Sequence, residues 1–163
     1  MHPGAFEFVG RYATTDAISV IEVGSRDLNG SIRCHFPGAT WTGLDLHSGP
    51  SVDIVLDALD YTPADLVDLV IIAEVFEHCP YWGEVLHHGA NWLKPGGRII
   101  ITAAGPGRDP HSAIDGGALH SDEHYSNVTQ DELAEELHYA GFKQIEVSGN
   151  EYWKDTYAIA TKA

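Results

Sequence analysis

The sequence contains little positive charge. Among its 163 residues, nine are Lys or Arg and 24 are Asp or Glu, so the formal net charge is −15. Most of such a surface repels a polyanion, and no cluster of basic residues offers a local exception. The charge therefore disfavours nucleic acid as a partner.

Cysteines and long apolar runs are also scarce. Cys34 and Cys79 are the only cysteines and lie far apart in the sequence, which is typical of reduced thiols in a cytoplasmic protein. No apolar stretch approaches the ~18 residues that span a membrane. The opening residues, MHPGAFEFVG, lack the pattern of a signal peptide. We therefore expect a cytoplasmic protein without a membrane partner.

Short β-branched segments alternate with helical patterns along the chain. Near-continuous Val, Ile and Leu predict strands that are covered on both faces, at 18–23, 40–46, 52–56, 66–73 and 98–103. Helices are predicted between them, at 28–36, 81–93 and 129–141. The last has a capping box, Thr129 with Glu132, and Gly141 as its C-cap. Two further strands, KQIEVSG and TYAIATK, close the chain and can pair antiparallel.

This order of elements predicts an α/β fold. We expect a three-layer sandwich around a doubly wound, mostly parallel sheet of about seven strands with an antiparallel C-terminal strand. Residues 1–163 are expected to form a single domain, in which 1–17 are an N-terminal lead. Residues 104–128 lack a regular pattern, and a loop of that length is usually a lid or binding segment. We expect it to be an active-site loop or lid.

The glycine-containing stretch VIEVGSRDLNG, residues 20–30, follows the first predicted strand. It is a poor phosphate loop, because a Walker A motif needs a glycine at the position of Asn29 and a lysine directly after it, where Gly30 stands. The dinucleotide fingerprint needs a glycine where Arg26 stands, and Glu22 would place a carboxylate near the pyrophosphate. The same features suit a cationic nucleoside such as S-adenosylmethionine, whose positive groups a carboxylate attracts. Gly24 and Gly30 would supply the bend and the room.

Asp45 ends the second predicted strand. At that position in a doubly wound fold, an acidic side chain accepts hydrogen bonds from ribose hydroxyls. Taken alone, Asp45 can equally be a turn or helix-cap aspartate. The motif ahead of it, Glu22-x-Gly24, favours the ribose role.

Several motifs occur in the order that class I S-adenosylmethionine-dependent methyltransferases show. VIEVGSRDLNG resembles that family's first motif, GLDL its ribose-binding acid, and VLDALD its adenine-side acid at Asp57. DLVIIAEVFEH is similar to the fourth-strand motif and LKPGGRIIIT to the turn and strand that follow. HYSNVTQDELAEELHYAGFKQIEV looks like the family's last helix and strand. The chain departs from the pattern at Ser25-Arg26-Asp27, where the family usually has small residues.

The resemblance implies an S-adenosyl-L-methionine cofactor, with S-adenosyl-L-homocysteine as its product. Glu22 and Gly24 would border the methionine moiety, Asp45 would hold the ribose, and Asp57 and Ala58 would flank the adenine. Ala73 and Glu74 would line the floor near the transferred methyl group. The full set of expected cofactor-binding residues is Glu22, Gly24, Ser25, Arg26, Gly30, Asp45, Leu46, Asp57, Ala58, Ala73 and Glu74.

The expected reaction moves the methyl group to an O or N atom, less readily a C atom, of a small acceptor. A base is needed only if the acceptor must lose a proton, and His78 and His124 are the candidate catalytic residues, with His111 and His120 behind them. Arg26 and Arg108 could hold an acidic group of the acceptor. With so short an N-terminal lead, the acceptor pocket is either open or completed by a second subunit of a homodimer. Phe6, Phe8 and Tyr12 are expected to cap the sheet.

Other readings of the sequence stay open. If EVFEH is helical, Glu74, Glu77 and His78 converge, with His124 as a fourth ligand, as in metal-assisted O-methyltransferases of small RNA and of the ubiquinone pathway, which this motif resembles. The same motif occurs in relatives without metal, and we expect none here. A protein or nucleic-acid acceptor is a further alternative. So is a nicotinamide-dependent oxidoreductase or a simple ligand-binding module, although Arg26 argues against the nicotinamide version.

Overall fold

The computed structural model describes residues 2–163, which contain one seven-stranded sheet with the order β3-β2-β1-β4-β5-β7-β6. The strands are β1 (Ser19–Val23), β2 (Thr40–Asp45), β3 (Ile54–Val55), β4 (Val67–Ala73), β5 (Leu93–Ala104), β6 (Phe142–Asn150) and β7 (Asp155–Lys162). Strands β1 to β5 are mutually parallel, and β7 is antiparallel to both neighbours. This confirms the predicted doubly wound sheet with its antiparallel closing pair.

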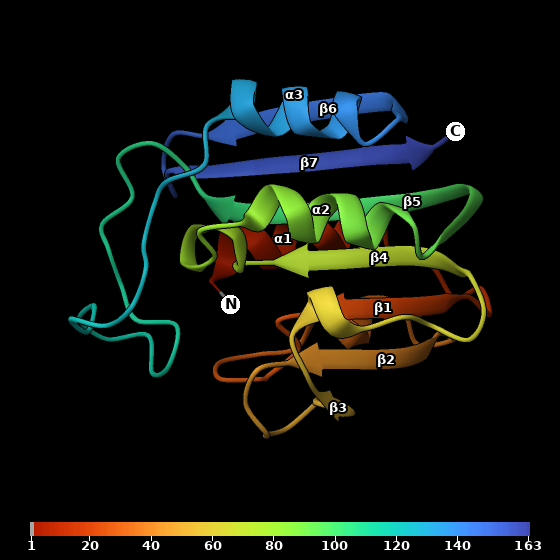
Figure 1. Ribbon diagram of the computed structural model, residues 1–163, viewed down its shortest axis with the longest axis horizontal. Helices are drawn as coiled ribbons and strands as arrows, with labels where there is room; N and C mark the ends of the chain where they lie inside the picture. Colours follow the sequence, from red (N-terminus) through yellow and green to blue (C-terminus); the bar gives the residue numbers. More distant parts are fainter. Residues whose placement is uncertain (1) are drawn as a thin grey trace.

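Helices cover both faces of the sheet (Figure 1). One face carries α2 (Trp82–Ala90) and α3 (Gln130–Tyr139), and the other carries α1 (Pro3–Gly10). Each helix buries an apolar stripe against the Val and Ile side chains of the central strands, which point alternately to the two faces. The ring of Phe8 in α1 stacks on Tyr157 of β7 with centroids 4.6 Å apart. The aromatic N-terminal lead therefore caps the sheet, as predicted.

The last helix begins and ends where its sequence signals predict. Thr129 Oγ1 accepts the N–H of Glu132, and the Glu132 carboxylate accepts the N–H of Thr129 at 3.0 Å. Gly141 has a φ of +80°, a left-handed conformation that glycine adopts without strain. This confirms the predicted capping box and C-cap.

The helix predicted over 28–36 is wrong. The structure has only a 3₁₀ turn there, η1 (Ile32–His35), and the side chain of Leu28 is 52% exposed. The reason is the backbone at Gly30, whose φ of +124° interrupts a right-handed helix. The Asp27 carboxylate accepts the Gly30 N–H at 2.6 Å and stabilises this turn. Ile32 and Phe36 are still buried in the core, so the apolar pattern identified these two core residues but not the exposed Leu28.

The long connection between β5 and α3 lies beyond the carboxyl ends of the parallel strands, at the left of Figure 1. We call residues 105–129 the lid segment; it contains no helix or strand, as the sequence predicts. Its C-terminal part is fixed to the body of the protein. The N–H of Ser126 donates to the Glu77 carbonyl and that of Val128 to the Ala104 carbonyl, both at 2.8 Å.

The outer strand β6 is irregular. Its pairing with β7 shifts register between Lys143 and Glu146, and Gln144 between them has a φ of +49°. Across residues 2–163, no helix is long and apolar enough to cross a membrane. Cys34 and Cys79 are not joined by a disulfide, in agreement with the prediction of reduced thiols.

Candidate cofactor and active site

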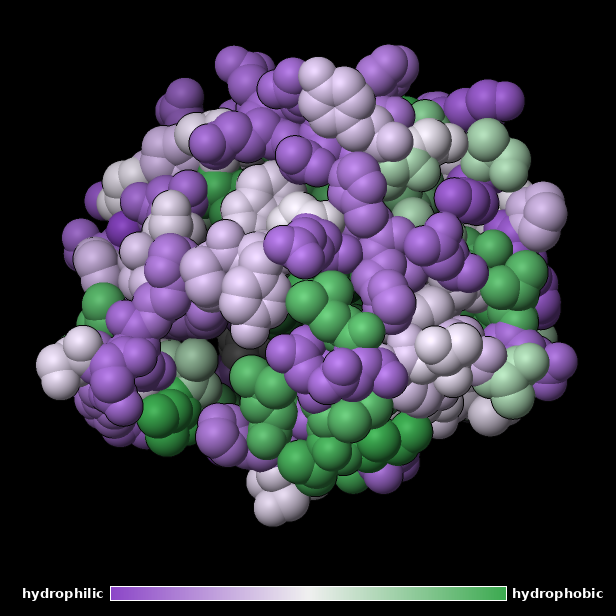
Figure 2. Space-filling model, viewed as in Figure 1, coloured by the Kyte–Doolittle hydropathy of each residue, from purple (hydrophilic) through white to green (hydrophobic). Residues whose placement is uncertain are grey.

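A cavity of about 630 Å³ opens at the carboxyl ends of the parallel strands, next to the lid segment. In Figure 2 the surface is hollowed at the left of centre, between that segment and the sheet. Every residue predicted to bind the cofactor lines this cavity, namely Glu22, Gly24, Ser25, Arg26, Gly30, Asp45, Leu46, Asp57, Ala58, Ala73 and Glu74. Its volume is in the range of small-molecule sites.

The loop after β1 forms one wall and bends sharply at its start. Gly24 has a φ of +74°, and a Cβ there would collide with the side chain of Val75. The N–H groups of Gly24 and Ser25 both donate to the Leu44 carbonyl, at 2.9 and 3.0 Å. A side chain at Gly24 would push the loop away from the sheet, so glycine is needed here both for its conformation and for its size.

Glu22 lies at the bottom of the cavity and is almost completely buried. Burial raises the pKa of its carboxyl to about 7, although the Arg33 guanidinium, with Nε 3.2 Å from the carboxylate, opposes that rise. A buried acid with this pKa changes its charge near neutral pH. When ionised, it offers a negative charge to a cationic group in the cavity.

Asp45 is held in place by main-chain groups. One carboxylate oxygen accepts the N–H of Arg26 at 3.1 Å, and the other accepts that of His47 at 2.9 Å. A carboxylate has about four acceptor positions, so two stay available for hydroxyl groups. Leu46 beside it is 63% exposed and gives the cavity an apolar margin.

Asp57 has a structural role as well as its place in the cavity wall. It caps the 3₁₀ turn η2 (Ala58–Asp60), where one of its oxygens accepts the N–H of Leu59 at 3.0 Å. Ala58 is buried behind it. Asp57 also raises the pKa of Tyr81, which lines the same side of the cavity.

Glu74 follows β4 and has a φ of +58°, a left-handed conformation that is uncommon outside glycine. Its carboxylate accepts the Thr102 hydroxyl at 3.0 Å. It also lies 3.4 Å from His2 Nε2 and 3.7 Å from an Arg108 nitrogen. These partners hold the pKa of Glu74 below its usual range despite burial.

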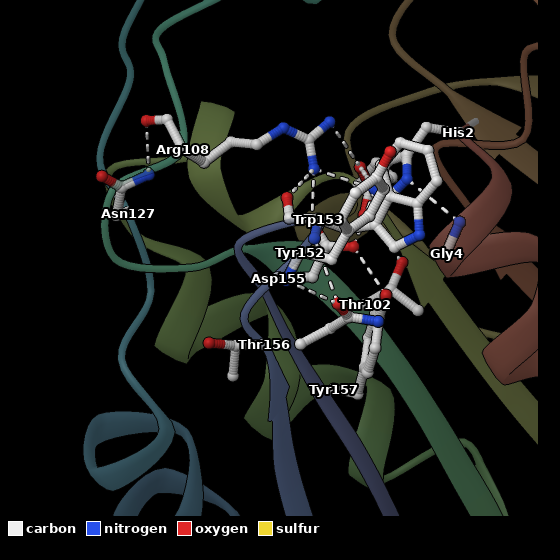
Figure 3. A network of polar contacts seen from close by, with 12 residues as sticks. His2, Gly4, Thr102, Arg108, Asn127, Tyr152, Trp153, Asp155, Thr156 and Tyr157 are labelled. Atoms are coloured by element: carbon white, nitrogen blue, oxygen red, sulfur yellow. Dashed lines mark hydrogen bonds and ion pairs between the residues drawn. The ribbon is translucent and has the colours of Figure 1, made fainter.

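A second buried carboxylate, Asp155 at the start of β7, completes this polar network (Figure 3). It accepts hydrogen bonds from Arg108 and from the hydroxyl of Tyr157, and lies 2.8 Å from His2 Nε2. Burial opposes charge on His2, but Asp155 and Glu74 outweigh it and raise its pKa to about 9. The ring is therefore protonated at neutral pH, and the Gly4 N–H, 3.2 Å from His2 Nδ1, can donate to it only at higher pH, where the ring is neutral.

The two arginines that could hold an acidic group of the acceptor both line the cavity and have protein partners. Arg108 pairs with Asp155, and the Arg26 guanidinium donates to the carbonyls of Ala113 and Ile114. Their role towards an acceptor stays a prediction.

Three aromatic rings meet where the lid segment joins the cavity. Those of His78, His111 and Tyr125 pack edge to face, with centroids 5.0 to 5.5 Å apart. His78 and His111 line the cavity. Burial and the nearby His111 lower the pKa of His78 to about 4, so His78 is neutral at physiological pH. His124, the other predicted catalytic residue, is exposed and does not line the cavity, so that expectation is not supported by its position.

Glu77 lies behind these rings in the 3₁₀ turn η3 (Phe76–His78) and is fully buried. Within residues 2–163, neither of its carboxylate oxygens has a hydrogen-bond partner, and the same holds for the buried Nδ1 of His78. Burial raises the pKa of Glu77 well above its ordinary value. Potential ligand atoms of Glu77, His78 and His111 all lie within 4.8 Å of one another.

This triad differs from the metal-ligand set that the sequence suggested. Glu74 was expected to converge with Glu77 and His78, but it groups with His2 and Asp155. The expected fourth ligand, His124, is replaced by His111 from the same segment. A turn of 3₁₀ helix between Glu74 and His78, in place of an α-helix, separates the two carboxylates.

Residues 9–147 match a family whose description is methyltransferase domain. The chain belongs to this family. The match confirms the resemblance seen in the sequence motifs and leaves the nicotinamide oxidoreductase alternative without support. No curated protein matches the chain in a sequence comparison.

Solved structures of methyltransferases share the fold. A 1,6-didemethyltoxoflavin-N1-methyltransferase from Burkholderia thailandensis, solved with 1,6-didemethyltoxoflavin and S-adenosylhomocysteine, aligns with a TM-score of 0.72 at 19% identity, over 99% of this chain and 77% of that one. A phosphoethanolamine N-methyltransferase 2 from Haemonchus contortus aligns with a TM-score of 0.71 at 15% identity, over 98% of this methyltransferase and 52% of that one. The chain thus spans about half the length of the Haemonchus enzyme. These likenesses confirm the class I methyltransferase fold.

The sequence analysis missed the charged residues His2, Lys154 and Asp155. His2 and Lys154 line the cavity, and Asp155 contacts His2. None of the three carries a sequence signal, since an aspartate at the start of a strand is more often exposed than buried.

Proposed function

We propose that this methyltransferase uses S-adenosylmethionine to methylate an O or N atom of a small-molecule acceptor. The observation that carries the proposal is Asp45. Two main-chain N–H groups orient its carboxylate at the cavity wall and leave acceptor positions for the two ribose hydroxyls. Cocrystallised S-adenosylhomocysteine in the Burkholderia thailandensis enzyme supports the choice of ligand.

The other cavity residues fit the remaining parts of such a ligand. Asp57 and Ala58 would flank the adenine, since a carboxylate there can accept from its exocyclic amine. Glu22 would attract the positive end of the methionine moiety, next to the tight turn at Gly24. Glu74 would then lie near the sulfonium, in the direction of His78 and His111.

When bound, S-adenosylmethionine supplies a methyl group activated by the positive sulfur. The protein contributes alignment of the acceptor behind that methyl group and removal of water from the cavity, which together lower the barrier of an in-line displacement. An acceptor hydroxyl or amine must also lose a proton. We assign this proton transfer to His78 or His111, the two packed imidazoles that line the cavity beside the lid segment.

A small acceptor agrees with the size of the cavity and with the net charge of the protein. The lid segment borders the cavity, and the formal net charge of −15 disfavours a nucleic acid. The bound 1,6-didemethyltoxoflavin of the Burkholderia thailandensis enzyme is also a small molecule.

Calorimetric titration with S-adenosylhomocysteine tests the cofactor assignment. We expect wild type to bind and Asp45→Ala to bind at least about ten-fold more weakly, because two charged hydrogen bonds are lost. The exposed Asp65→Ala, outside the cavity, is the matched control and should bind as wild type does. Absence of binding by wild type, or equal binding by wild type and Asp45→Ala, would contradict the proposal.

A second candidate function is metal-assisted O-methylation, and the triad of Glu77, His78 and His111 favours it. Two imidazoles and one carboxylate are a donor set for first-row transition metals, with positions left open for acceptor oxygens. A bound ion would lower the pKa of an acceptor hydroxyl. His111 Nδ1 lies 3.2 Å from the Asp109 carbonyl, and a hydrogen bond there leaves Nε2 as the ligand atom.

Titration with Co²⁺, followed by its visible absorption, tests this second function. We expect wild type to bind one ion, and Glu77→Gln and His111→Ala to lose it. His124→Ala, in the same segment but outside the cavity, should retain it. Equal Co²⁺ binding by all four proteins would exclude the triad, whereas S-adenosylhomocysteine binding is expected to be unaffected by Glu77→Gln.

A further inference from the structure

The side chain of Arg26 lines the cavity and reaches the lid segment. Its Nη2 donates to the carbonyl oxygens of Ala113 at 3.2 Å and Ile114 at 2.9 Å, which are 87 and 88 positions away in the chain. The main-chain N–H of the same residue donates to the Asp45 carboxylate. Arg26 therefore joins the carboxylate proposed to bind ribose to the lid segment on the opposite wall.

The direction of the Arg26 side chain is set by packing. A Cβ on Gly49 would lie 2.8 Å from Cγ and 3.0 Å from Cδ of Arg26, so the aliphatic part lies directly on the loop after β2. This contact holds the aliphatic part of the Arg26 side chain in place, while the guanidinium extends to the lid segment. The guanidinium is thus oriented before it meets the lid segment.

Arg26 meets a part of the lid segment that is ordered by its own contacts. The Glu123 carboxylate accepts the Ser112 hydroxyl at 3.0 Å, the Ala113 N–H at 2.8 Å and the His120 N–H at 2.9 Å. The Ser112 N–H in turn donates to the Gly117 carbonyl at 3.0 Å. We call residues 112–123 the lid tip; these bonds make it a compact unit that can move as one body.

The lid tip depends on Arg26 for its attachment. In the described part of the chain, the two Arg26 bonds are the only hydrogen bonds or ion pairs between residues 112–123 and any residue outside the lid segment. The base of the segment is fixed separately, through Ser126 and Val128. The lid segment is thus fixed at its base, and its tip is hydrogen-bonded to the rest of the protein through one side chain. The tip can open when the two Arg26 bonds break.

We propose that Arg26 is a latch that holds the lid tip closed over the cofactor cavity, and that its release sets the rate at which S-adenosylmethionine enters and S-adenosylhomocysteine leaves. This inference rests on the proposed function. Arg26 is also a positioning residue, because the latched tip begins directly after His111 and keeps that ring against the cavity.

Stopped-flow binding of S-adenosylhomocysteine tests the latch. In Arg26→Ala we expect the association and dissociation rate constants both to rise, by about ten-fold, so that Kd changes less than either rate. Arg26→Lys should give intermediate rates, since an ammonium keeps the charge but lacks the planar guanidinium that orients Nη2 towards the two carbonyls. Lys143→Ala, on the exposed outer strand β6, is the control and should behave as wild type.

Hydrogen exchange provides a readout that a cofactor contact alone would not change. In unliganded Arg26→Ala, the amides of 112–123 should exchange faster, while those of α3 keep their wild-type rates. Unchanged rate constants, or a rise in dissociation alone, would overturn the latch. Failure of wild type to bind S-adenosylhomocysteine would instead overturn the proposed function.

Discussion

Single carboxylates stabilise this protein at places well away from the cavity, and Asp68 of β4 is the clearest. It accepts the N–H and hydroxyl of Ser19 at 2.8 and 2.7 Å and pairs with Lys94 Nζ at 2.7 Å. These bonds connect the beginnings of β1, β4 and β5. Lys94 and then Ser19 lower the pKa of Asp68 to about 2.

We predict that Asp68→Asn lowers the midpoint of thermal unfolding at pH 7 by about 3 °C. The pKa of Asp68 is lower in the folded state than its ordinary value of 3.8, so its contribution is complete above pH 3.8 and is lost as the pH falls towards 2. The difference in free energy of unfolding between wild type and Asp68→Asn should therefore be constant from pH 7 to 5 and smaller at pH 3. Denaturant unfolding at these pH values measures this free-energy difference, with the exposed Asp65→Asn as the control variant. A difference that is as large at pH 3 as at pH 7 would show that it does not come from the lowered pKa of Asp68.

The sequence indicated which residues line the cavity, but not the partners of its charged residues. Asp45 and Glu74 could be placed because parallel strands end at one edge of a sheet; Asp45 is the last residue of β2 and Glu74 directly follows β4. The partners of Arg26 and Arg108 could not be predicted, because they lie 87 and 47 positions away, where no sequence periodicity indicates a contact. Long-range pairing of a flexible side chain has no local signature.

At the scale of elements, predictability followed the strength of local signals. The helix that begins at Gln130 has a capping residue, an apolar stripe and a C-terminal glycine, and the structure reproduces all three. The stretch 28–36 has a stripe alone, and the left-handed Gly30 overrides it. Strands were found because Val and Ile runs are long, although β3 is reduced to Ile54–Val55.

The lid segment shows where prediction from the sequence ends. Its irregularity was predicted, but its three histidine candidates could not be ranked correctly, because an irregular chain has no period that assigns side chains to faces. The structure directs His111 into the cavity and leaves His124 exposed. The bonds that order this part of the chain, from Ser112 to Glu123 and from Arg26 to the Ala113 carbonyl, join residues 11 and 87 positions apart.

The whole molecule carries a strong negative charge, which should act on a charged ligand. S-adenosylmethionine has one positive charge more than S-adenosylhomocysteine, on its sulfonium. With a formal net charge of −15, the protein should attract the former more strongly at low salt.

We therefore predict that raising NaCl from about 20 mM to about 500 mM weakens S-adenosylmethionine binding more than S-adenosylhomocysteine binding, because salt screens long-range attraction. Paired calorimetric titrations at the two salt concentrations measure the ratio of the two affinities. If added NaCl lowers the affinity for both ligands by the same factor, net charge has no part in the choice between them.

The irregular pairing of β6 bears on how copies of this protein behave towards one another. An outer strand with a straight, free backbone can accept a strand from a neighbouring molecule and so begin aggregation. Here the register shift and the left-handed Gln144 bend that backbone, and Lys143 and Glu146 place charges along it. At the opposite edge, β3 offers only two residues. Neither edge is a suitable template for cross-β growth, so the sheet can stay at seven strands even where the protein is concentrated.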